Sequence, residues 1–269
     1  MISFPNAKIN FGLYITGKRE DGYHNIQTLM IPINLFDALE FVEAKNDSFT
    51  ISGIDIPGDP NQNLVIKALH LVRKNFKIPK IKVHLHKNIP AGSGLGGGSA
   101  DASFMIKMLN DYFKIGMDIQ EMQNLASSLG SDCSYFIRNT PQIATGRGEI
   151  LEEVDFRLPG KYLYIFRPDF SISTKEAYQG IKINKKPVEL KEIIKDDPNN
   201  WKNSVFNEFE KKIFKDFPAM EDIKNKLYQS GAIYASMSGS GSAFFGIYDK
   251  NPIITREIQS ILIHTQKLN

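Results

Sequence analysis

Cysteine is almost absent from this chain of 269 residues, because Cys133 is the only one. A single cysteine excludes an internal disulfide framework and a zinc site built from several cysteines. It fits a reducing compartment, so we expect a cytoplasmic protein. Long hydrophobic runs are missing too, since no stretch reaches the roughly 20 apolar residues of a membrane-spanning helix. The first residues, with Pro5 and Lys8 inside their apolar stretch, are unlike a signal peptide.

An excess of charge of one sign is also missing. The chain has 33 basic and 30 acidic residues, interspersed, and a net charge of +3. A protein that binds nucleic acid through its phosphates usually carries a basic stripe, so this balance argues against such a partner. The hydrophobic fraction of 42% excludes general disorder. We therefore expect a soluble globular protein that binds neither nucleic acid nor a membrane.

The first half of the chain has strand patterns followed by helix patterns. Residues 8–15 and 26–33 read as strands, and Asp21-Gly22 between them predicts a hairpin turn. Strands that precede helices without regular alternation favour an α+β fold over a doubly wound sheet. Further strands are predicted over 38–44, 49–54 and 81–85, and helices over 64–75, from the end of the glycine loop to 112, and 118–129.

The second half reads as a separate α+β domain. The charged stretch 148–160 is a plausible boundary, so we expect domains over 1–155 and 156–269. Residues 182–200 are polar and weakly patterned. Strands are predicted over 162–166, 233–237 and 243–248, and helices over 173–181, 205–214 and 218–228.

A glycine-rich loop is the strongest local signal of function. Five of the seven residues from 92 to 98 are glycine, and a strand precedes the loop while a helix follows it. Each glycine costs about 0.5–1 kcal/mol relative to alanine in regular structure, which suggests that the backbone must approach a ligand closely. Bare N–H groups and the positive end of the following helix suit a polyphosphate.

The context of this loop argues against three common classes of glycine-rich phosphate loop. No Gly-Lys-Ser/Thr closes it, so it is not a Walker A motif. Gly92, Gly94 and Gly97 satisfy the dinucleotide fingerprint, but two helical patterns follow without the strand that a Rossmann fold needs. The H-R-D and D-F-G motifs of protein kinases are missing.

Lys8 and Asp132 are candidates for chemistry, although each alone could be an ordinary surface or helix-end residue. Phosphorylation of a hydroxyl needs a carboxylate to orient or deprotonate the acceptor and a cation to stabilise negative charge. Tyr23 and His24 could stack on a base and read its edge, or could simply pack at the turn. The glycines and serines of 238–242 could form a plain hairpin loop or lend backbone donors to a ligand.

Three segments together resemble the motifs of the GHMP small-molecule kinases. They are 5–10, 90–100 and 236–242, and they are supported by 21–24, 63–65, 130–132 and 207–210. The resemblance covers nearly the whole chain in order. It implies a two-domain architecture with a deep cleft, an N-terminal half like ribosomal protein S5 domain 2 and a ferredoxin-like C-terminal half.

The resemblance also implies roles for individual residues. Lys8 and Asp132 match the catalytic pair. The implied substrate-binding residues are Asn10, Tyr23, His24, Thr174, Tyr178, Gly239 and Ser240. The implied nucleotide-binding residues are Asn63, Lys87, Pro90, Ala91, Gly92, Ser93, Gly94, Leu95, Gly96, Gly97, Gly98, Ser99 and Ala100, and Ser99 is the one candidate ligand to Mg²⁺.

The implied activity is ATP- and Mg²⁺-dependent phosphorylation of the 2-hydroxyl of a cytidine diphosphate-linked polyol in non-mevalonate isoprenoid precursor biosynthesis. No obligate protein partner is implied. Another kinase of the family, acting on homoserine, mevalonate or a sugar, is the first alternative, and an S5-like RNA-binding module is the second. One departure is Glu208, which stands where the family usually has aspartate, so the role of that position is open.

Overall fold

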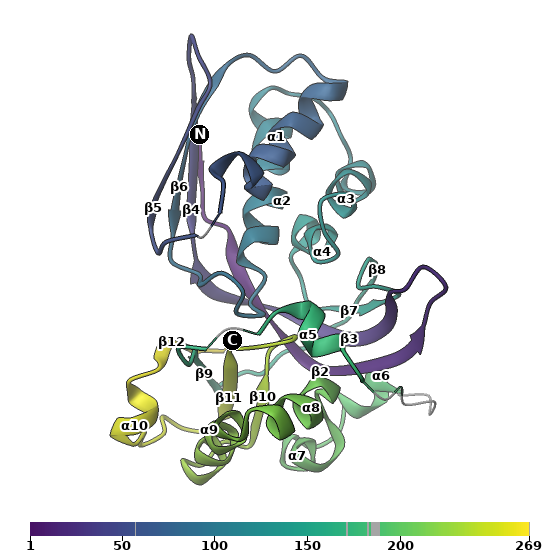
Figure 1. Ribbon diagram of the computed structural model, residues 1–269, viewed down its shortest axis with the longest axis vertical. Coiled ribbons are helices and arrows are strands. Elements are labelled where there is room, and N and C mark those ends of the chain that lie inside the picture. The colour runs from purple at the N-terminus through teal and green to yellow at the C-terminus, as the bar shows by residue number, and fades with distance from the viewer. Residues whose placement is uncertain (57, 171, 182, 184–188, 269) are drawn as a thin grey trace. The chain divides into compact units, whose positions relative to one another are not determined.

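The computed structural model of the chain describes residues 1–56, 58–170, 172–181, 183 and 189–268. Within them, strands and helices form two compact units, each built from several stretches of the chain (Figure 1). Unit 1 contains Met1–Lys8, Pro32–Ala91 and Gly96–Thr140. Unit 2 contains Ile9–Ile31, Gly92–Leu95 and Pro141–Asn269.

Unit 1 is a sheet with helices packed on one face (Figure 1). The strand order is β1-β4-β6-β5, with β5 parallel to β6 and the other pairs antiparallel. The strands are β1 (Ile2–Ser3), β4 (Ala38–Glu43), β5 (Ser48–Gly53) and β6 (Ile81–Lys87). The helices are η1 (Pro60–Gln62), α1 (Leu64–Asn75), α2 (Gly97–Tyr112), α3 (Ile119–Ser127) and α4 (Cys133–Arg138).

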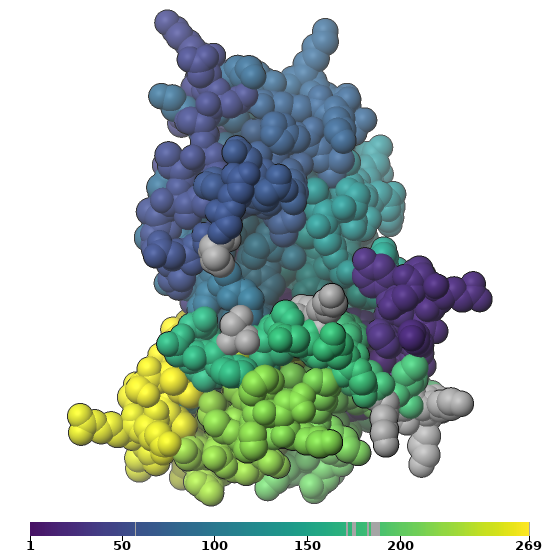
Figure 2. Space-filling model, in the orientation of Figure 1, coloured from purple at the N-terminus to yellow at the C-terminus, as the bar shows by residue number. Residues whose placement is uncertain are grey.

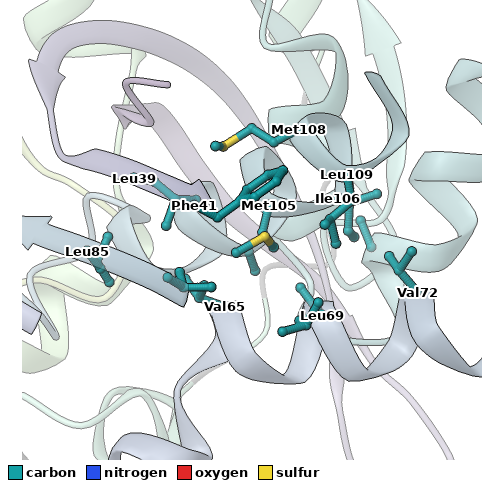
Figure 3. Packing of buried hydrophobic residues seen from close by; sticks show 14 of the residues in the cluster. Leu39, Phe41, Val65, Leu69, Val72, Leu85, Met105, Ile106, Met108 and Leu109 are labelled. Carbon is teal, nitrogen blue, oxygen red and sulfur yellow. The ribbon is translucent and has the colours of Figure 1, made fainter. Parts of the chain in front are cut away.

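The core of unit 1 lies between its sheet and α1 and α2. Figure 3 shows Phe41 of β4 beside Met105 of α2, and Leu85 of β6 belongs to the same cluster. On α1, residues 65, 68, 69 and 72 are buried, which is the spacing of one helix face. Burial of each such side chain stabilises the fold by about 1.5–3 kcal/mol. This packing holds the end of β6 and the start of α2, where the glycine loop lies.

Two long strands pass through both units. They are β2 (Asn6–Lys18) and β3 (His24–Phe36), which belong to a sheet of order β2-β3-β7-β8 with β7 (Gln142–Thr145) and β8 (Ile150–Glu153). The hairpin expected around Asp21-Gly22 is confirmed. Its tip is exposed and forms the purple projection in Figure 2.

Unit 2 contains a second, antiparallel sheet of order β10-β11-β9-β12. Its central strands are apolar on both faces, since all five residues of β11 are buried. Its strands are β9 (Tyr162–Phe166), β10 (Tyr234–Met237), β11 (Phe244–Tyr248) and β12 (Leu262–Lys267). The helices of this unit are α5 (Thr174–Tyr178), α6 (Leu190–Ile193), η2 (Pro198–Asn200), α7 (Trp201–Ser204), α8 (Glu208–Asp216), α9 (Pro218–Gln229) and α10 (Arg256–Gln259).

The expected α+β class is confirmed, and the sequence patterns missed several of the shortest elements. Among the described residues they are β1, η1, α4, β7, β8, α6, η2, α7, α10 and β12, each of two to six residues. Elements this short hold too few periods for a pattern to stand out. The helix expected from residue 205 begins at Glu208 instead, because Asn207 caps it. The domain division expected at residue 155 stays a prediction. In the described part of the chain, no helix combines the length and the apolar character that crossing a bilayer requires.

Candidate active site

Lys8 and Asp132 form an ion pair in unit 1. Lys8 Nζ lies 3.3 Å from Asp132 Oδ2. The Lys8 side chain is 3% exposed and that of Asp132 is 31% exposed. Asp132 is the N-cap of α4, but within the described chain its carboxylate makes no capping hydrogen bond to the helix. A buried amine therefore orients a carboxylate that a substrate can still reach.

The glycine loop runs directly beside Lys8. Gly96 has a φ of +76°, and a Cβ atom there would lie 2.9 Å from Phe136 Cζ and 3.1 Å from Lys8 Cε. Only glycine permits this backbone conformation without strain and this close approach. Gly96 is also the N-cap of the 16-residue helix α2, and it has no side chain to cap the first N–H groups. These N–H groups and the helix dipole make the position suitable for an anion.

Lys87 has two buried carboxylates around its amine. Lys87 Nζ donates a hydrogen bond to Asp101 Oδ2 at 2.8 Å and another to Asp37. Asp37 Oδ1 also accepts the N–H groups of Asn88 and Ile89, at 2.6 and 2.8 Å. Burial raises the pKa of Asp101 from 3.8 to about 8, with Lys87 opposing the shift and Asp37 adding to it. Burial therefore favours the protonated form of Asp101.

Sequence reasoning missed both carboxylates. Asp101 shares one buried face of α2 with Met105 and Met108, at the i, i+4, i+7 spacing. That spacing was the available signal for its burial. Asp37 lies between β3 and β4, where no pattern marks it.

A cavity of about 280 Å³ lies beside Lys87 in unit 1. This is close to the lower end of the roughly 300–1,000 Å³ of ligand pockets, which suits one nucleoside. Asn63 lines it and caps α1, since Asn63 Oδ1 accepts the Val65 N–H at 2.9 Å. Other lining residues include Ile51, Ile56, Leu64, Ala91, Gly98 and Asp101. The structure thus brings Asn63 and Lys87 together with two residues of the glycine loop.

Asn10 contacts residues 238–242 of unit 2, which we call the second glycine loop. The Asn10 N–H donates to Ser238 Oγ at 3.3 Å, and Asn10 Nδ2 donates to Thr28 Oγ1 at 3.1 Å. A Cβ atom on Gly239 would lie 3.2 Å from Asn10 Oδ1. The structure therefore places Asn10 and Gly239 side by side, with Ser240 following in the chain.

The predicted aromatic residues meet in the same unit. The rings of His24 and Tyr178 stack with centroids 4.9 Å apart, and Tyr178 meets the edge of Phe209. The Tyr23 ring is exposed, and the Arg147 guanidinium lies 5.2 Å from its centroid. The sequence patterns missed Arg147. Thr174 begins α5, but its side chain lies outside the part of the chain that the structure describes.

Cys133 is a packing residue and not a nucleophile. Burial raises the pKa of its thiol to about 11, and the hydroxyl groups of Ser99 and Ser103 contact it. Ser99, the candidate metal ligand, therefore lies beside Cys133, the first residue of α4. Among the described residues, no group of three His, Cys, Asp or Glu side chains could hold a metal ion.

A glycine-rich loop beside a lysine–aspartate pair, in an α+β chain with a second glycine loop, fits a small-molecule kinase. Residues 63–139 match the model of the GHMP kinases N terminal domain, and residues 187–259 match that of the GHMP kinases C terminal domain. The chain belongs to the GHMP kinases, and the expected two-domain α+β architecture is confirmed.

Curated relatives narrow the class. A 4-diphosphocytidyl-2-C-methyl-D-erythritol kinase of Bacteroides fragilis is 48% identical over 261 residues, which are 95% of either chain. The enzyme of the same name from Parabacteroides distasonis is 48% identical over 250 residues, covering 93% of this chain and 92% of its own length.

Solved structures of the same family are similar to this chain. A crystal structure of 4-(cytidine 5'-diphospho)-2C-methyl-D-erythritol kinase matches with a TM-score of 0.79 and 28% identity, covering 91% of this chain and 89% of that chain. The mevalonate kinase of Methanococcus jannaschii matches with a TM-score of 0.66 and 15% identity, covering 97% and 92% of the two chains. At that identity the second likeness shows the fold alone.

Proposed function

We propose that this kinase transfers the γ-phosphoryl group of ATP to the 2-hydroxyl of 4-diphosphocytidyl-2-C-methyl-D-erythritol, in the cytoplasm. The observation that carries the proposal is the ion pair between Lys8 Nζ and Asp132 Oδ2 beside the glycine loop. The names of relatives 48% identical support the choice of acceptor. In this reaction Asp132 orients or takes the hydroxyl proton, and Lys8 stabilises negative charge on the transferring group.

The nucleoside of ATP occupies unit 1. It lies in the 280 Å³ cavity, where Asn63 and Lys87 are the polar walls. The phosphates of ATP lie along Pro90–Ala100, where the first N–H groups of α2 stabilise their charge. Catalysis of phosphoryl transfer is mostly positioning and charge stabilisation, so this loop contributes a large part of the catalysis.

The acceptor is held by residues of unit 2. Its cytosine stacks on Tyr23 and meets His24, with Tyr178 and Thr174 as a further wall. The stacked pair of His24 and Tyr178 supports this, because it holds both rings in one place before any ligand binds. Asn10, Gly239 and Ser240 contact the polyol end, and the close approach of Gly239 to Asn10 Oδ1 supports that placement.

The residues near the glycine loop fit a magnesium ion bound through ATP. The Ser99 hydroxyl hydrogen-bonds the Cys133 thiol and lowers its pKa, and its oxygen is of the hard type that Mg²⁺ prefers. Mg²⁺ usually takes one or two protein oxygens together with substrate phosphates. When bound, the ion neutralises charge on the phosphates. Ser99 is the residue that would hold it.

A coupled assay of ADP release tests the proposal. The purified chain is given ATP, Mg²⁺ and, in turn, 4-diphosphocytidyl-2-C-methyl-D-erythritol, mevalonate, homoserine and a sugar. We expect turnover with the first and inhibition by CMP competing with it, since both would occupy the cytosine site. Turnover with another acceptor, without competition by CMP, would identify a different kinase of the family.

A further inference from the structure

The motif Asn207-Glu-Phe-Glu210 has no role in the reaction described so far. Asn207 caps α8 and Glu210 lies in its first turn. Both side chains are buried, with residue exposures of 3% and 6%. A buried amide or carboxylate costs free energy unless its polar atoms are hydrogen-bonded, so each of them must have partners that justify its burial.

The Asn207 side chain binds two carbonyl groups at the start of the second glycine loop. Asn207 Nδ2 donates to the carbonyl oxygens of Met237 and Gly239, at 2.8 Å each. Asn207 Oδ1 accepts the Phe209 N–H at 3.0 Å. One amide therefore fixes the backbone on both sides of Ser238 and ties it to the start of α8.

Glu210 holds the same segment from its other edge. Glu210 Oε1 accepts the Met237 N–H at 2.8 Å and the Ser236 hydroxyl at 3.0 Å. Glu210 Oε2 pairs with Lys224 Nζ at 2.5 Å. Hydrogen bonds to an ionised group are about twice as strong as neutral ones, so this carboxylate is a rigid anchor for residues 236 and 237.

Ser238, the residue between these anchors, reaches both candidate binding elements of unit 2. Its hydroxyl donates to the Gly94 carbonyl at 3.0 Å and accepts the Asn10 N–H at 3.3 Å. The Ala243 N–H donates to the Ser93 carbonyl at 3.0 Å. A Cβ atom on Gly94 would collide with the Ser238 carbonyl. The first part of the phosphate loop, Gly92–Leu95, is thus packed on the segment that Asn207 and Glu210 hold.

Glu208 anchors a different strand from the same helix start. Its carboxylate accepts the Ile15 N–H, and the Leu13 N–H donates to the Phe206 carbonyl at 2.8 Å. The position that departs from the usual aspartate therefore binds β2, the strand that carries Asn10. Its contact with Ile15 separates its role from that of Asn207 and Glu210.

We propose that Asn207 and Glu210 are positioning residues of this kinase, which set the place of Gly92–Leu95 and of Asn10 through the backbone around Ser238. This proposal rests on the kinase activity proposed above. The polar atoms of the two side chains bind the protein itself, so they act on substrates only through the loop. A misplacement of about 1 Å can cost about 10²-fold in rate, which gives these distant residues a kinetic effect.

Asn207→Asp tests the proposal with one changed atom. It replaces the amide that donates to two carbonyls with an oxygen that repels them. For the folded variant we expect KM for both ATP and the acceptor to rise about tenfold, and kcat/KM to fall about 10²-fold. Ser238→Ala removes only the hydroxyl between Gly94 and Asn10, and we expect it to raise both KM values. Asn203→Asp, the same change on an exposed asparagine of α7, is the matched control and leaves all values unchanged.

A purely structural role has a different signature. It lowers the melting temperature and the fraction of active enzyme, but the molecules that fold keep wild-type KM values. That result for Asn207→Asp and Ser238→Ala would overturn the proposal. Glu210→Gln keeps the shape of the side chain without its charge. This variant replaces Asn207→Asp in the experiment if Asn207→Asp does not fold. Unchanged KM values in Glu210→Gln would contradict the proposal equally.

Binding of ADP, measured by calorimetry, separates this proposal from the proposed function. If the wild-type chain binds ADP but does not phosphorylate the cytidine-linked acceptor, only the proposed acceptor is wrong. The ADP dissociation constant of Asn207→Asp then still tests the positioning of Gly92–Leu95. We expect it to rise about tenfold, and an unchanged constant would contradict the inference.

Discussion

The amine of Lys8 lies 3.3 Å from the carboxylate of Asp132, in unit 1. The lysine is buried beneath Gly96, and the carboxylate is partly exposed. The buried partner has little freedom to move, so the accessible one is held in one orientation. This pair is the centre of the proposed chemistry, and it leads to the first prediction.

Asp132→Asn removes the base and keeps the size of the side chain. We expect turnover to fall by about 10²–10⁴-fold, the usual contribution of a general base. The dissociation constant for ADP should stay close to that of the wild type, because Asp132 does not contact the nucleoside cavity. Steady-state kinetics and calorimetry measure the two quantities. Equal losses in both would indicate a structural role for Asp132.

Gly96→Ala tests the close approach of the phosphate loop to Lys8. The new Cβ atom would lie 2.9 Å from Phe136 Cζ, in a backbone conformation with φ of +76°. We expect the free energy of unfolding to fall by about 1–3 kcal/mol, the cost of such a strained residue. Urea unfolding measures it. Gly98→Ala is the control for stability, because its Cβ atom would meet only Leu64 Cδ1, at 3.8 Å.

Asp101→Asn tests whether the Asp101 carboxyl group beside Lys87 has a raised pKa. Between pH of about 4 and 8, folded Asp101 keeps a proton that the unfolded chain has lost, because its pKa is raised from 3.8 to about 8. The folded state therefore binds more protons, and its stability falls as the pH rises through this window. One proton changes the folding equilibrium by at most about tenfold per pH unit.

The variant cannot titrate at this position, so its unfolding free energy should fall less steeply over that range. Urea unfolding at several pH values measures the slopes. Asp111→Asn, an exposed change on the same helix, should keep the wild-type slope. Parallel slopes for wild type and Asp101→Asn would mean that Asp101 is ionised in the folded protein.

Tyr178→Leu removes the ring that stacks on His24. Ring pairs contribute about 0.5–1.5 kcal/mol beyond their burial, so the acceptor KM should rise about threefold to tenfold. The KM for ATP should not change, because Tyr178 is not among the described residues that line the nucleoside cavity. Steady-state kinetics with each substrate varied in turn gives both values. A rise in the ATP value alone would place Tyr178 outside the acceptor site.

Much of the candidate site could be predicted from sequence because its parts are local. Gly92 to Gly98 and the helix after them favour an anion site by backbone chemistry alone. The hairpin turn before Tyr23 was predicted from Asp21-Gly22. The partners of Lys87 could not be predicted. Asp37 and Asp101 reach it from different elements, and nothing in the spacing of 37, 87 and 101 marks them as neighbours.

The short elements were missed for a related reason. A helix of six residues, such as α4, has fewer than two turns, so its pattern is weak and its stability comes from packing. The start of α4 nevertheless fixes the position of Asp132, because Asp132 is the N-cap of this helix. The role of Asn207 was equally hidden, because its two carbonyl partners lie some 30 residues further along the chain.

By itself, the sequence of this protein indicated where a glycine-rich loop could bind an anion, where the longer strands and helices lie, and which family the chain resembles. These features depend on residues next to one another, whose conformations are set by local sterics and hydrogen bonding. Only the tertiary structure decided that Lys8 meets Asp132, that Lys87 lies between two acids, and that Asn207 holds the second glycine loop. Such contacts join residues far apart in sequence, and they form only when the buried cores have packed.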